Sequence, residues 1–184
     1  MTLADQIALA AGELAQGAAG TDPDALAALG AAIAAAPRIV TYGCGREGLM
    51  MRALAMRLYH LGLDVHCVGD MSCPPLGAGD LFLVSSGPGQ LSTVAALILQ
   101  ARAAGACIAC VTAEPAGPDP QSADLVLTIP AQTMARDRTS SALLPMGSIF
   151  EGAQFLIFEL LVLDLRQRLG QTTAGMRARH TNLE

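Results

Sequence analysis

Short apolar runs alternate with helical patterns from residue 37 onward, and this alternation constrains the fold more than any other feature of the chain. The runs expected to be strands are residues 38–42, 63–68, 81–85, 106–112 and 125–129. Strands that are apolar throughout and separated by helices pair in parallel, with both faces of the sheet covered. The sequence therefore predicts an α/β three-layer sandwich with the flavodoxin-like strand order 2-1-3-4-5.

The remaining segments show apolar residues at three- and four-residue spacing, which indicates helices. These are expected at residues 2–16, 22–35, 48–61, 90–104, 145–169 and 173–180. Asp22 as N-cap and Pro23 in the first turn give the second helix a clear start, and Gly62 closes the third. The 184 residues are expected to form one domain: a helical extension (1–36), an α/β core (37–170) and a C-terminal helix and tail (171–184).

The charge pattern excludes several classes of partner. A net charge of −5 leaves no basic face to neutralise phosphates, so no nucleic acid is expected. The most apolar stretch, residues 149–165, contains Glu151, Glu159 and Asp164, and charges are costly at membrane depth. A buried helix is therefore expected there, and no membrane partner.

The five cysteines are scattered, and the N-terminus has no basic region typical of a secretory signal. Free thiols in a reducing compartment, the cytoplasm, are the expectation. Cys107 and Cys110 form a C-x-x-C pattern inside an expected strand, where side chains three apart point to opposite faces. No metal site is therefore expected.

Two glycine-rich turns follow expected strands and lead into expected helices, at residues 43–48 and 85–90. Strands one and three are neighbours in the predicted order, so both turns should line one cleft at the carboxyl edge of the sheet. Glycine allows a backbone to approach a ligand, and helix N-termini attract polar or anionic groups. The candidate binding residues are Gly43, Gly45, Arg46, Glu47, Ser86, Gly87, Gly89, Gln90, Ser92 and Thr93. Either turn taken alone is also consistent with a tight strand-to-helix connection.

The first turn also matches G-x-G-x-x-G, a fingerprint of dinucleotide sites, with Asp64 or Asp70 as the acidic partner. Against this interpretation, a single domain of this size has no second half to hold the rest of a dinucleotide.

Three ionisable residues are candidates for proton transfer. Glu151 lies near the start of the long last helix in apolar surroundings, where burial would raise its pKa toward that of a useful base. A first-turn acid that only interacts with the helix dipole explains Glu151 equally well. His60 is equally consistent with a core histidine, and His180 with a solvated tail. His66, on a strand, is expected to be structural.

Four segments together resemble the 6-phospho-3-hexuloisomerases of the SIS (sugar isomerase) superfamily. They are Gly43-x-Gly-Arg, residues 56–62 (Met-Arg-Leu-x-His-Leu-Gly), residues 145–151 (Pro-Met-Gly-Ser-Ile-Phe-Glu) and residues 176–184 (Met-Arg-x-Arg-His-Thr-Asn-Leu-Glu). The resemblance implies a cofactor-free isomerisation of a sugar or sugar phosphate through an enediol. It also implies Glu151 as the base, His60 or His180 as the acid, and a homo-oligomer, tetramer or dimer, in which His180 serves a neighbouring subunit.

The chain departs from the family pattern in both turns. The family has Ser where this chain has Glu47, and it holds the substrate phosphate with hydroxyls that Pro88 and Leu91 replace here; Gln90 replaces a Glu. Two like charges about 4 Å apart repel by about 4 kcal/mol at an effective dielectric near 20. Unless Glu47 turns away or pairs with Arg46, the substrate is expected to differ, with a sugar lacking phosphate as one possibility.

Two further alternatives for the function stay open at this point. One is that the substrate is a sugar phosphate held by Ser92, Thr93 and backbone amides, and the other is that the chain is a non-catalytic sugar-binding module of the SIS type. The segment 132–144, with Arg136, Asp137 and Arg138, is either a lid over the cleft or a plain loop.

Overall fold

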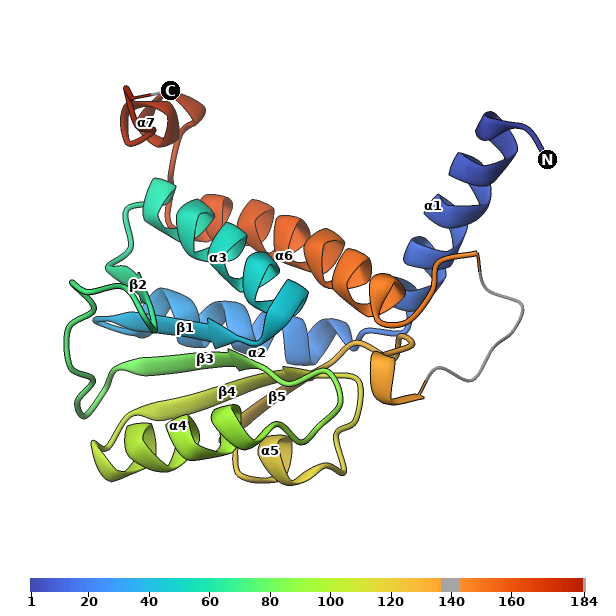
Figure 1. Cartoon of the computed structure of the whole chain (residues 1–184). Coiled ribbons are helices and arrows are strands. Elements are labelled where there is room, and N and C mark those ends of the chain that lie inside the picture. Colours follow the sequence, from blue (N-terminus) through green and yellow to red (C-terminus); the bar gives the residue numbers. More distant parts are fainter. Residues whose placement is uncertain (137–142, 184) are drawn as a thin grey trace.

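A five-stranded, all-parallel sheet forms the centre of the molecule in the computed structural model, which describes residues 1–136 and 143–183 (Figure 1). The strands are β1 (Ile39–Gly43), β2 (Val65–Cys67), β3 (Leu81–Ser85), β4 (Cys107–Thr112) and β5 (Leu125–Thr128). Their order is β2-β1-β3-β4-β5, which confirms the predicted topology. The three central strands β1, β3 and β4 contribute side chains to both hydrophobic clusters of the core, which is why their sequences are apolar on both faces.

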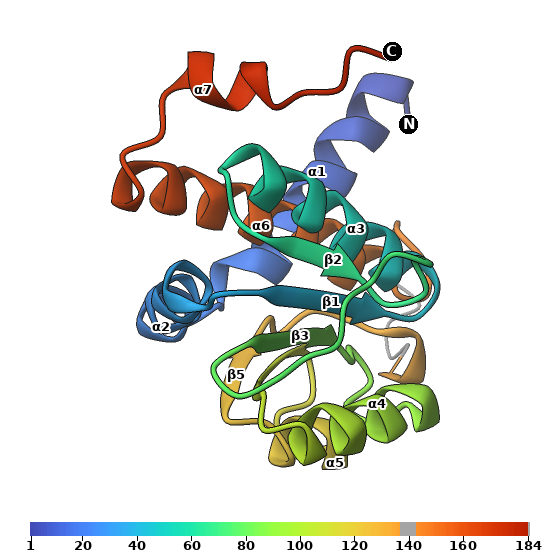
Figure 2. The same cartoon turned by 90° about the vertical axis from the view of Figure 1, so that its left-hand side faces the viewer.

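Helices cover both faces of this sheet (Figures 1 and 2). They are α1 (Leu3–Ala19), α2 (Pro23–Ala35), α3 (Gly45–His60), α4 (Ser92–Ala103), α5 (Pro118–Gln121), α6 (Ser148–Arg168) and α7 (Thr173–Ala178), with a 3-10 turn at Met134–Arg136. Helices α2, α3 and α6 pack on one face, and α4 and α5 on the other. None of the helices within the described residues is long and apolar enough to cross a bilayer.

Local signals explain where these helices begin. Thr2 caps α1 in a reciprocal pair with Asp5, and Asp22 accepts a hydrogen bond from the Asp24 N–H at the start of α2. Helix α3 begins at Gly45, earlier than expected, because Gly45 takes a positive φ of 56° that turns the chain directly from β1 into the helix. The N-terminus of α3 therefore sits at the end of β1.

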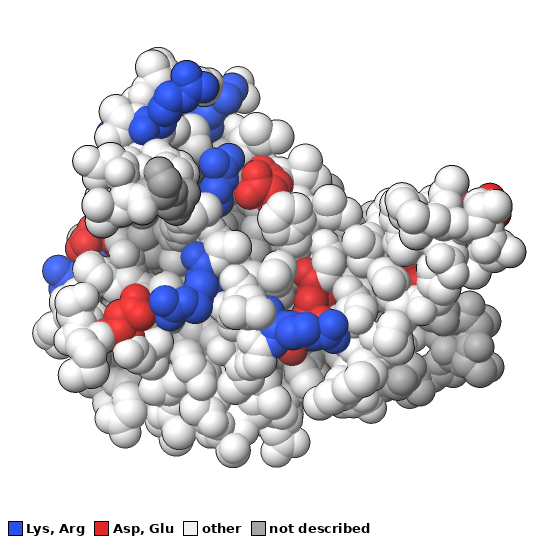
Figure 3. Space-filling model, turned by 45° about the horizontal axis from the view of Figure 1, so that its top comes forward, with Lys and Arg blue, Asp and Glu red and all other residues white. Residues whose placement is uncertain are grey.

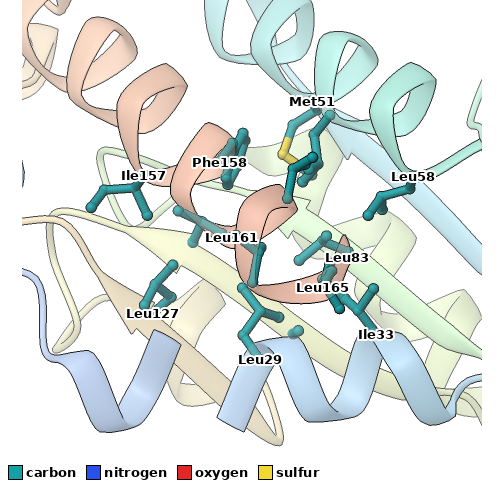
Figure 4. Close-up of a cluster of buried hydrophobic side chains, with 14 of the residues drawn as sticks. Leu29, Ile33, Met51, Leu58, Leu83, Leu127, Ile157, Phe158, Leu161 and Leu165 are labelled. Atoms are coloured by element: carbon teal, nitrogen blue, oxygen red, sulfur yellow. The ribbon is translucent and has the colours of Figure 1, made fainter. Parts of the chain in front are cut away.

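The larger core lies between the sheet and the layer of α2, α3 and α6 (Figure 4). Helix α6 supplies one row of this core, and the facing side chains come from the other helices and the sheet: Ile157, Phe158, Leu161 and Leu165 against Leu29, Ile33, Met51, Leu58, Leu83 and Leu127. Burial at about 25 cal/mol per Å² makes this packing the main stabilising term of the fold. It fixes the start of α6 beside the start of α3.

The cysteines behave as structural residues. All five are free thiols, and Cys107 packs against the core beside α6 whereas Cys110 lies in the core beside α4, so the two point to opposite faces as predicted. Burial raises the pKa of the Cys110 thiol to about 12, which keeps it protonated and unreactive.

Candidate functional site

The two glycine-rich turns lie side by side, because β1 and β3 pair with Gly43 directly opposite Ser85. A pocket of ≈ 250 Å³ opens beside them. It is lined by Cys44, Gly45, Arg46, Glu47, Pro88, Leu91, Thr133, Met134, Met146, Gly147, Phe150 and Glu151. The start of α6 closes the pocket opposite the start of α3, so two helix N-termini meet at one cavity of a size that suits a small ligand.

Arg46 and Glu151 form an ion pair across this pocket, with the Nη2 atom 2.7 Å from Oε2. The Arg46 Nη1 atom also donates to Ser148 Oγ at 3.1 Å, so one guanidinium joins the N-termini of α3 and α6. Burial raises the pKa of Glu151, and Arg46 opposes the rise through its charge and its hydrogen bond. Glu151 is therefore a positioned carboxylate whose proton affinity is higher than that of a solvated one.

Glu47 turns away from Arg46, into the base of the second turn. Its Oε2 atom accepts hydrogen bonds from Ser85 Oγ at 2.6 Å and from the Gly87 N–H at 2.8 Å. Burial raises the pKa of Glu47, the two hydrogen bonds lower it, and the nearby charge of Glu151 raises it further. Of the two arrangements considered for Glu47, turning away or pairing with Arg46, the structure has the first, and Arg46 binds Glu151.

A second buried carboxylate, Asp119, organises the same turn from the other side. Its Oδ2 atom accepts from Ser86 Oγ at 2.6 Å and from the Leu91 N–H at 2.7 Å. Asp119 lies in α5, a one-turn helix of sequence Pro-Asp-Pro-Gln that is too short to show a periodic pattern. No motif in the sequence pointed to Asp119. It reaches the turn only because α5 packs against β4 and α4 in the folded chain.

Gln154 completes the buried network from α6. Its Nε2 atom donates to Ser85 Oγ at 2.9 Å, and the side chain is fully buried. Ser85 thus receives one hydrogen bond from α6 and gives one to Glu47 on α3. Sequence reasoning missed both Ser85 and Gln154 as parts of the site, because the pairing depends on the packing of α6 over β3.

The other predicted binding residues lie around the pocket and not in its lining. Gly43 packs against the backbone of Gly48, and Gly89 has a positive φ of 78° and lies against Glu114 and Gly117. Ser86 is fully buried, whereas Gln90, Ser92 and Thr93 are exposed. Asp137 and Arg138 of the possible lid lie outside the described residues.

His60 and His180 meet at a separate place, at the opposite end of α3. Their ring centroids are 5.2 Å apart, in a pocket of ≈ 680 Å³ formed with Tyr59, Arg179 and Asn182 among others. From Glu47 to His60 the helix rises about 20 Å at 1.5 Å per residue. Within one chain, the predicted base and the two predicted acids are therefore not brought together.

The geometry also bears on the dinucleotide interpretation. Gly48 lets α3 approach β1 so closely that a Cβ there would clash with the Gly43 carbonyl oxygen. Asp64, one of the two expected ribose ligands, accepts from Arg38 at 3.0 Å and contacts His66 Nε2 at 2.9 Å, at the amino end of β2. Gly43 and Gly48 thus serve helix packing, and Asp64 lies at the amino edge of the sheet, whereas the pocket opens at the carboxyl edge. His66 is held in this exposed pair.

The backbone is strained at the rim of the pocket. Met146, just before α6, takes a positive φ of 57°, a conformation unfavourable for a bulky side chain. Its carbonyl oxygen accepts a hydrogen bond from Gln132 Nε2 at 3.2 Å, which links the segment before α6 to the segment that follows β5. Such strain is typical of functional sites. Among the described residues, no group of three or more His, Cys, Asp or Glu side chains is placed to hold a metal ion.

The pocket is lined by the Glu151 carboxylate, which the Arg46 guanidinium holds, and by the apolar ring of Phe150. Thr133 adds a hydroxyl group to the lining, and Met134 and Met146 add thioethers. A carboxylate of raised pKa beside a cation can accept a proton from carbon and return it, while the cation stabilises negative charge that develops on the neighbouring oxygen. This arrangement suits proton transfer on a small polyhydroxylated carbonyl compound.

Comparison with known proteins gives a consistent result. The SIS domain model matches residues 32–149. A 3-hexulose-6-phosphate isomerase of Mycobacterium gastri is 37% identical over 182 residues, which cover 99% of this chain and 92% of the relative. The enzyme of the same name from Methylomonas aminofaciens is 39% identical over 151 residues, 82% of each chain.

Among solved structures, a protein of Methanococcus jannaschii, whose structure led to an inferred function of 3-hexulose-6-phosphate isomerase, superposes with a TM-score of 0.84. It shares 26% identity, and the match covers 98% of this chain and 99% of that one. The family match, the sequence similarity and the fold agree, and the chain belongs to the SIS domain family.

Proposed function

We propose that this chain is a sugar isomerase that moves a carbonyl group between adjacent carbons of a sugar or sugar phosphate. Relatives that share 37% and 39% of their residues with it are named as isomerases of a phosphorylated hexulose. The single observation that carries the proposal is Glu151, held by Arg46 at 2.7 Å in the pocket where the two glycine-rich turns meet.

In the proposed mechanism Glu151 takes the proton from the carbon beside the carbonyl and returns it to the neighbouring carbon through an enediol. The raised pKa of Glu151 brings its proton affinity closer to what this exchange needs. Arg46, already in the pocket, faces the negative charge that develops on the enediol oxygens. No redox cofactor is needed, because the oxidation of one carbon balances the reduction of the next.

A second group must move protons between the two oxygens, and we propose that His60 or His180 of a neighbouring copy does so. His60 lies about 20 Å along α3 from Glu47, which lines the Glu151 pocket. His180 lies beside His60, at the other pocket. Only assembly of copies brings such a pair to another chain's Glu151.

Exposed apolar side chains support that assembly as a homodimer or homotetramer. Helices α1, α3 and α6 expose large ones: Leu3, Ile7, Leu49, Met56, Tyr59, Phe155, Leu160 and Leu163. Figure 3 shows blue and red groups side by side over the middle of this side, a mostly white arm at the α1 end, and a hollow between the α7 end and the α1 end. Large exposed apolar side chains gathered on one side are typical of an interface between proteins. The free thiols support a reducing compartment, the cytoplasm, as the place of action.

Assay of Glu151→Gln tests the proposal. The wild type is incubated with ketoses, aldoses and their terminal phosphates, and the products are identified by NMR. We expect one isomer pair to interconvert, and Glu151→Gln to lower the rate about 10²- to 10⁴-fold. Glu159→Gln, the same change on an exposed residue of the same helix, is the control and should leave the rate unchanged. An unaffected Glu151→Gln, or binding of a sugar without any interconversion, would contradict the proposal and favour a sugar-binding module.

A further inference from the structure

The second glycine-rich turn has the form of an anion-binding loop, since it follows β3 and leads into the N-terminus of α4. Four of its donors are nonetheless occupied by carboxylates of the protein. The Gly87 N–H and Ser85 Oγ donate to Glu47, and the Leu91 N–H and Ser86 Oγ donate to Asp119. These are charge-assisted hydrogen bonds of 2.6–2.8 Å, the stronger kind.

Two backbone N–H groups of the turn are also paired, with carbonyl oxygens of the chain. The Ser86 N–H donates to the Val111 carbonyl oxygen at 2.9 Å, and the Gly89 N–H donates to the Ser86 carbonyl oxygen at 2.9 Å. Pro88 has no N–H to offer. The turn is thus built around two carboxylates of the protein itself, where a loop that binds an anionic ligand would present its N–H and hydroxyl groups to the cavity.

Packing holds Glu47 in this place. A Cβ added at Gly87 would lie 2.7 Å from Glu47 Oε1 and 2.8 Å from Phe150 Cε1. Only glycine at this position leaves room for the Glu47 carboxylate. Ser85, which binds Glu47, is itself bound by the buried Gln154 of α6. Displacing Glu47 would break a network that joins α3, β3 and α6.

The charged residues that line the pocket also disfavour an anionic ligand. The pocket contains one guanidinium, Arg46, and two carboxylates, Glu47 and Glu151. Arg46 is already paired with Glu151, so a phosphate ester would bring further negative charge beside the Glu47 carboxylate. Like charges about 4 Å apart repel by about 4 kcal/mol at an effective dielectric of 20, whereas a sugar hydroxyl donates a hydrogen bond to a carboxylate without that repulsion.

We infer that Glu47 is a specificity-determining residue that fills the anion position of the second turn, so that the substrate presents hydroxyl groups there and carries no phosphate. The inference rests on the proposed function for the sugar chemistry of the pocket, and it narrows the substrate to a neutral sugar. Glu47 acts by occupying the donors of the turn and by repelling a second anion.

Ligand binding to two variants tests this inference. Fructose and fructose 6-phosphate serve as a matched pair of probes, and thermal unfolding reports binding because a ligand of the folded state raises its stability. The wild type should bind the phosphate ester no better than the parent sugar. Glu47→Ser frees the Gly87 N–H and supplies a hydroxyl, and should tighten binding of the ester relative to fructose about tenfold or more.

Glu47→Gln separates charge from occupancy. Its amide oxygen accepts the same hydrogen bonds, so it keeps the donors occupied and the turn folded while removing the charge; its gain for the ester should be smaller than that of Glu47→Ser. Glu159→Gln controls for the change in net charge and should match the wild type.

Two results would overturn the inference. One is a wild type that binds the ester about tenfold or more tightly than fructose. The other is a folded Glu47→Ser protein whose affinity for the ester is no higher than that of the wild type.

The binding experiment does not depend on turnover, so it is independent of the isomerase proposal. If that proposal fails, the ligands still bind with the expected preference but are not interconverted.

Discussion

At the scale of single residues, two carboxylates in one pocket are placed in opposite ways. Glu151 faces the cavity and is held by Arg46, whereas Glu47 is turned into the protein and held by Ser85 and Gly87. The sequence showed that Glu47 replaces a family serine, and the structure shows what its carboxylate binds. Burial is the largest cause of the raised pKa in both residues, and the partners then set their roles.

The raised pKa of Glu47 predicts a dependence of stability on pH. The folded chain binds the Glu47 proton more tightly than the unfolded chain, whose pKa is near the ordinary value of 4.5. This contribution to the free energy of unfolding is fully present below pH 4.5 and is lost as the pH rises through the folded pKa. Glu47→Gln has no such loss, so its stability relative to the wild type should increase with pH across that window.

Urea denaturation of both proteins at a series of pH values measures this difference. Glu159→Gln serves as the reference for removal of an exposed carboxylate from the same chain. Parallel stability curves for the wild type and Glu47→Gln would show that burial of the Glu47 carboxylate carries no penalty.

At the scale of elements, the sequence was sufficient for the sheet and insufficient for the connections. The bounds of β3 and the strand order agree with prediction, because continuous apolar runs between helices have few alternatives. Helix α5 and the 3-10 turn at Met134–Arg136 were missed, since one turn shows no periodicity. The pocket at the two glycine-rich turns was predictable from β1 and β3 as neighbours, whereas Asp119 and Gln154 reach the turn only through tertiary packing.

The close contact between β1 and α3 predicts a strong effect of Gly48→Ala. The added methyl group would clash with the Gly43 carbonyl oxygen, so the start of α3 must move away from the strand. Overpacking of this kind costs about 1–3 kcal/mol, and it displaces Arg46 and Glu47, which lie in the same first turn. Gly12→Ala, on an open face of α1, is the matched control and should raise stability slightly.

Thermal unfolding and activity of these two glycine variants provide the measurement. A Gly48→Ala protein as stable and active as the wild type would show that the packing of α3 on β1 does not position the site.

At the scale of the whole molecule, two pockets lie at opposite ends of α3, and we propose that each is half of a site completed by another copy. The Glu151 pocket lies at the carboxyl edge of the sheet, and the His60–His180 pocket lies beside α7. The family resemblance suggested the two histidines as candidates. The sequence alone did not show that, within one chain, they lie at the opposite end of α3 from the Glu151 pocket. Exposed apolar residues on α1, α3 and α6 offer the surface for joining copies.

Mixing two inactive variants tests whether copies share their sites. Glu151→Gln and a double variant, His60→Ala with His180→Ala, should each lose activity. A mixture that exchanges subunits should regain about a quarter of the wild-type activity if the oligomer is a dimer, because half of the dimers carry one intact site of two. Light scattering on the eluting protein confirms the assembly. Mixed oligomers without any recovered activity would place the whole site within one chain.

The central claim, that Glu151 transfers a proton on a sugar carbon, is tested most directly by solvent exchange. The protein is incubated in D2O with the sugar it binds, and NMR follows deuterium at the carbons beside the carbonyl. We predict deuterium at one such carbon with the wild type and Glu159→Gln, and almost none with Glu151→Gln. Equal incorporation with Glu151→Gln, or none with the wild type while the carbonyl does not move, would contradict the account.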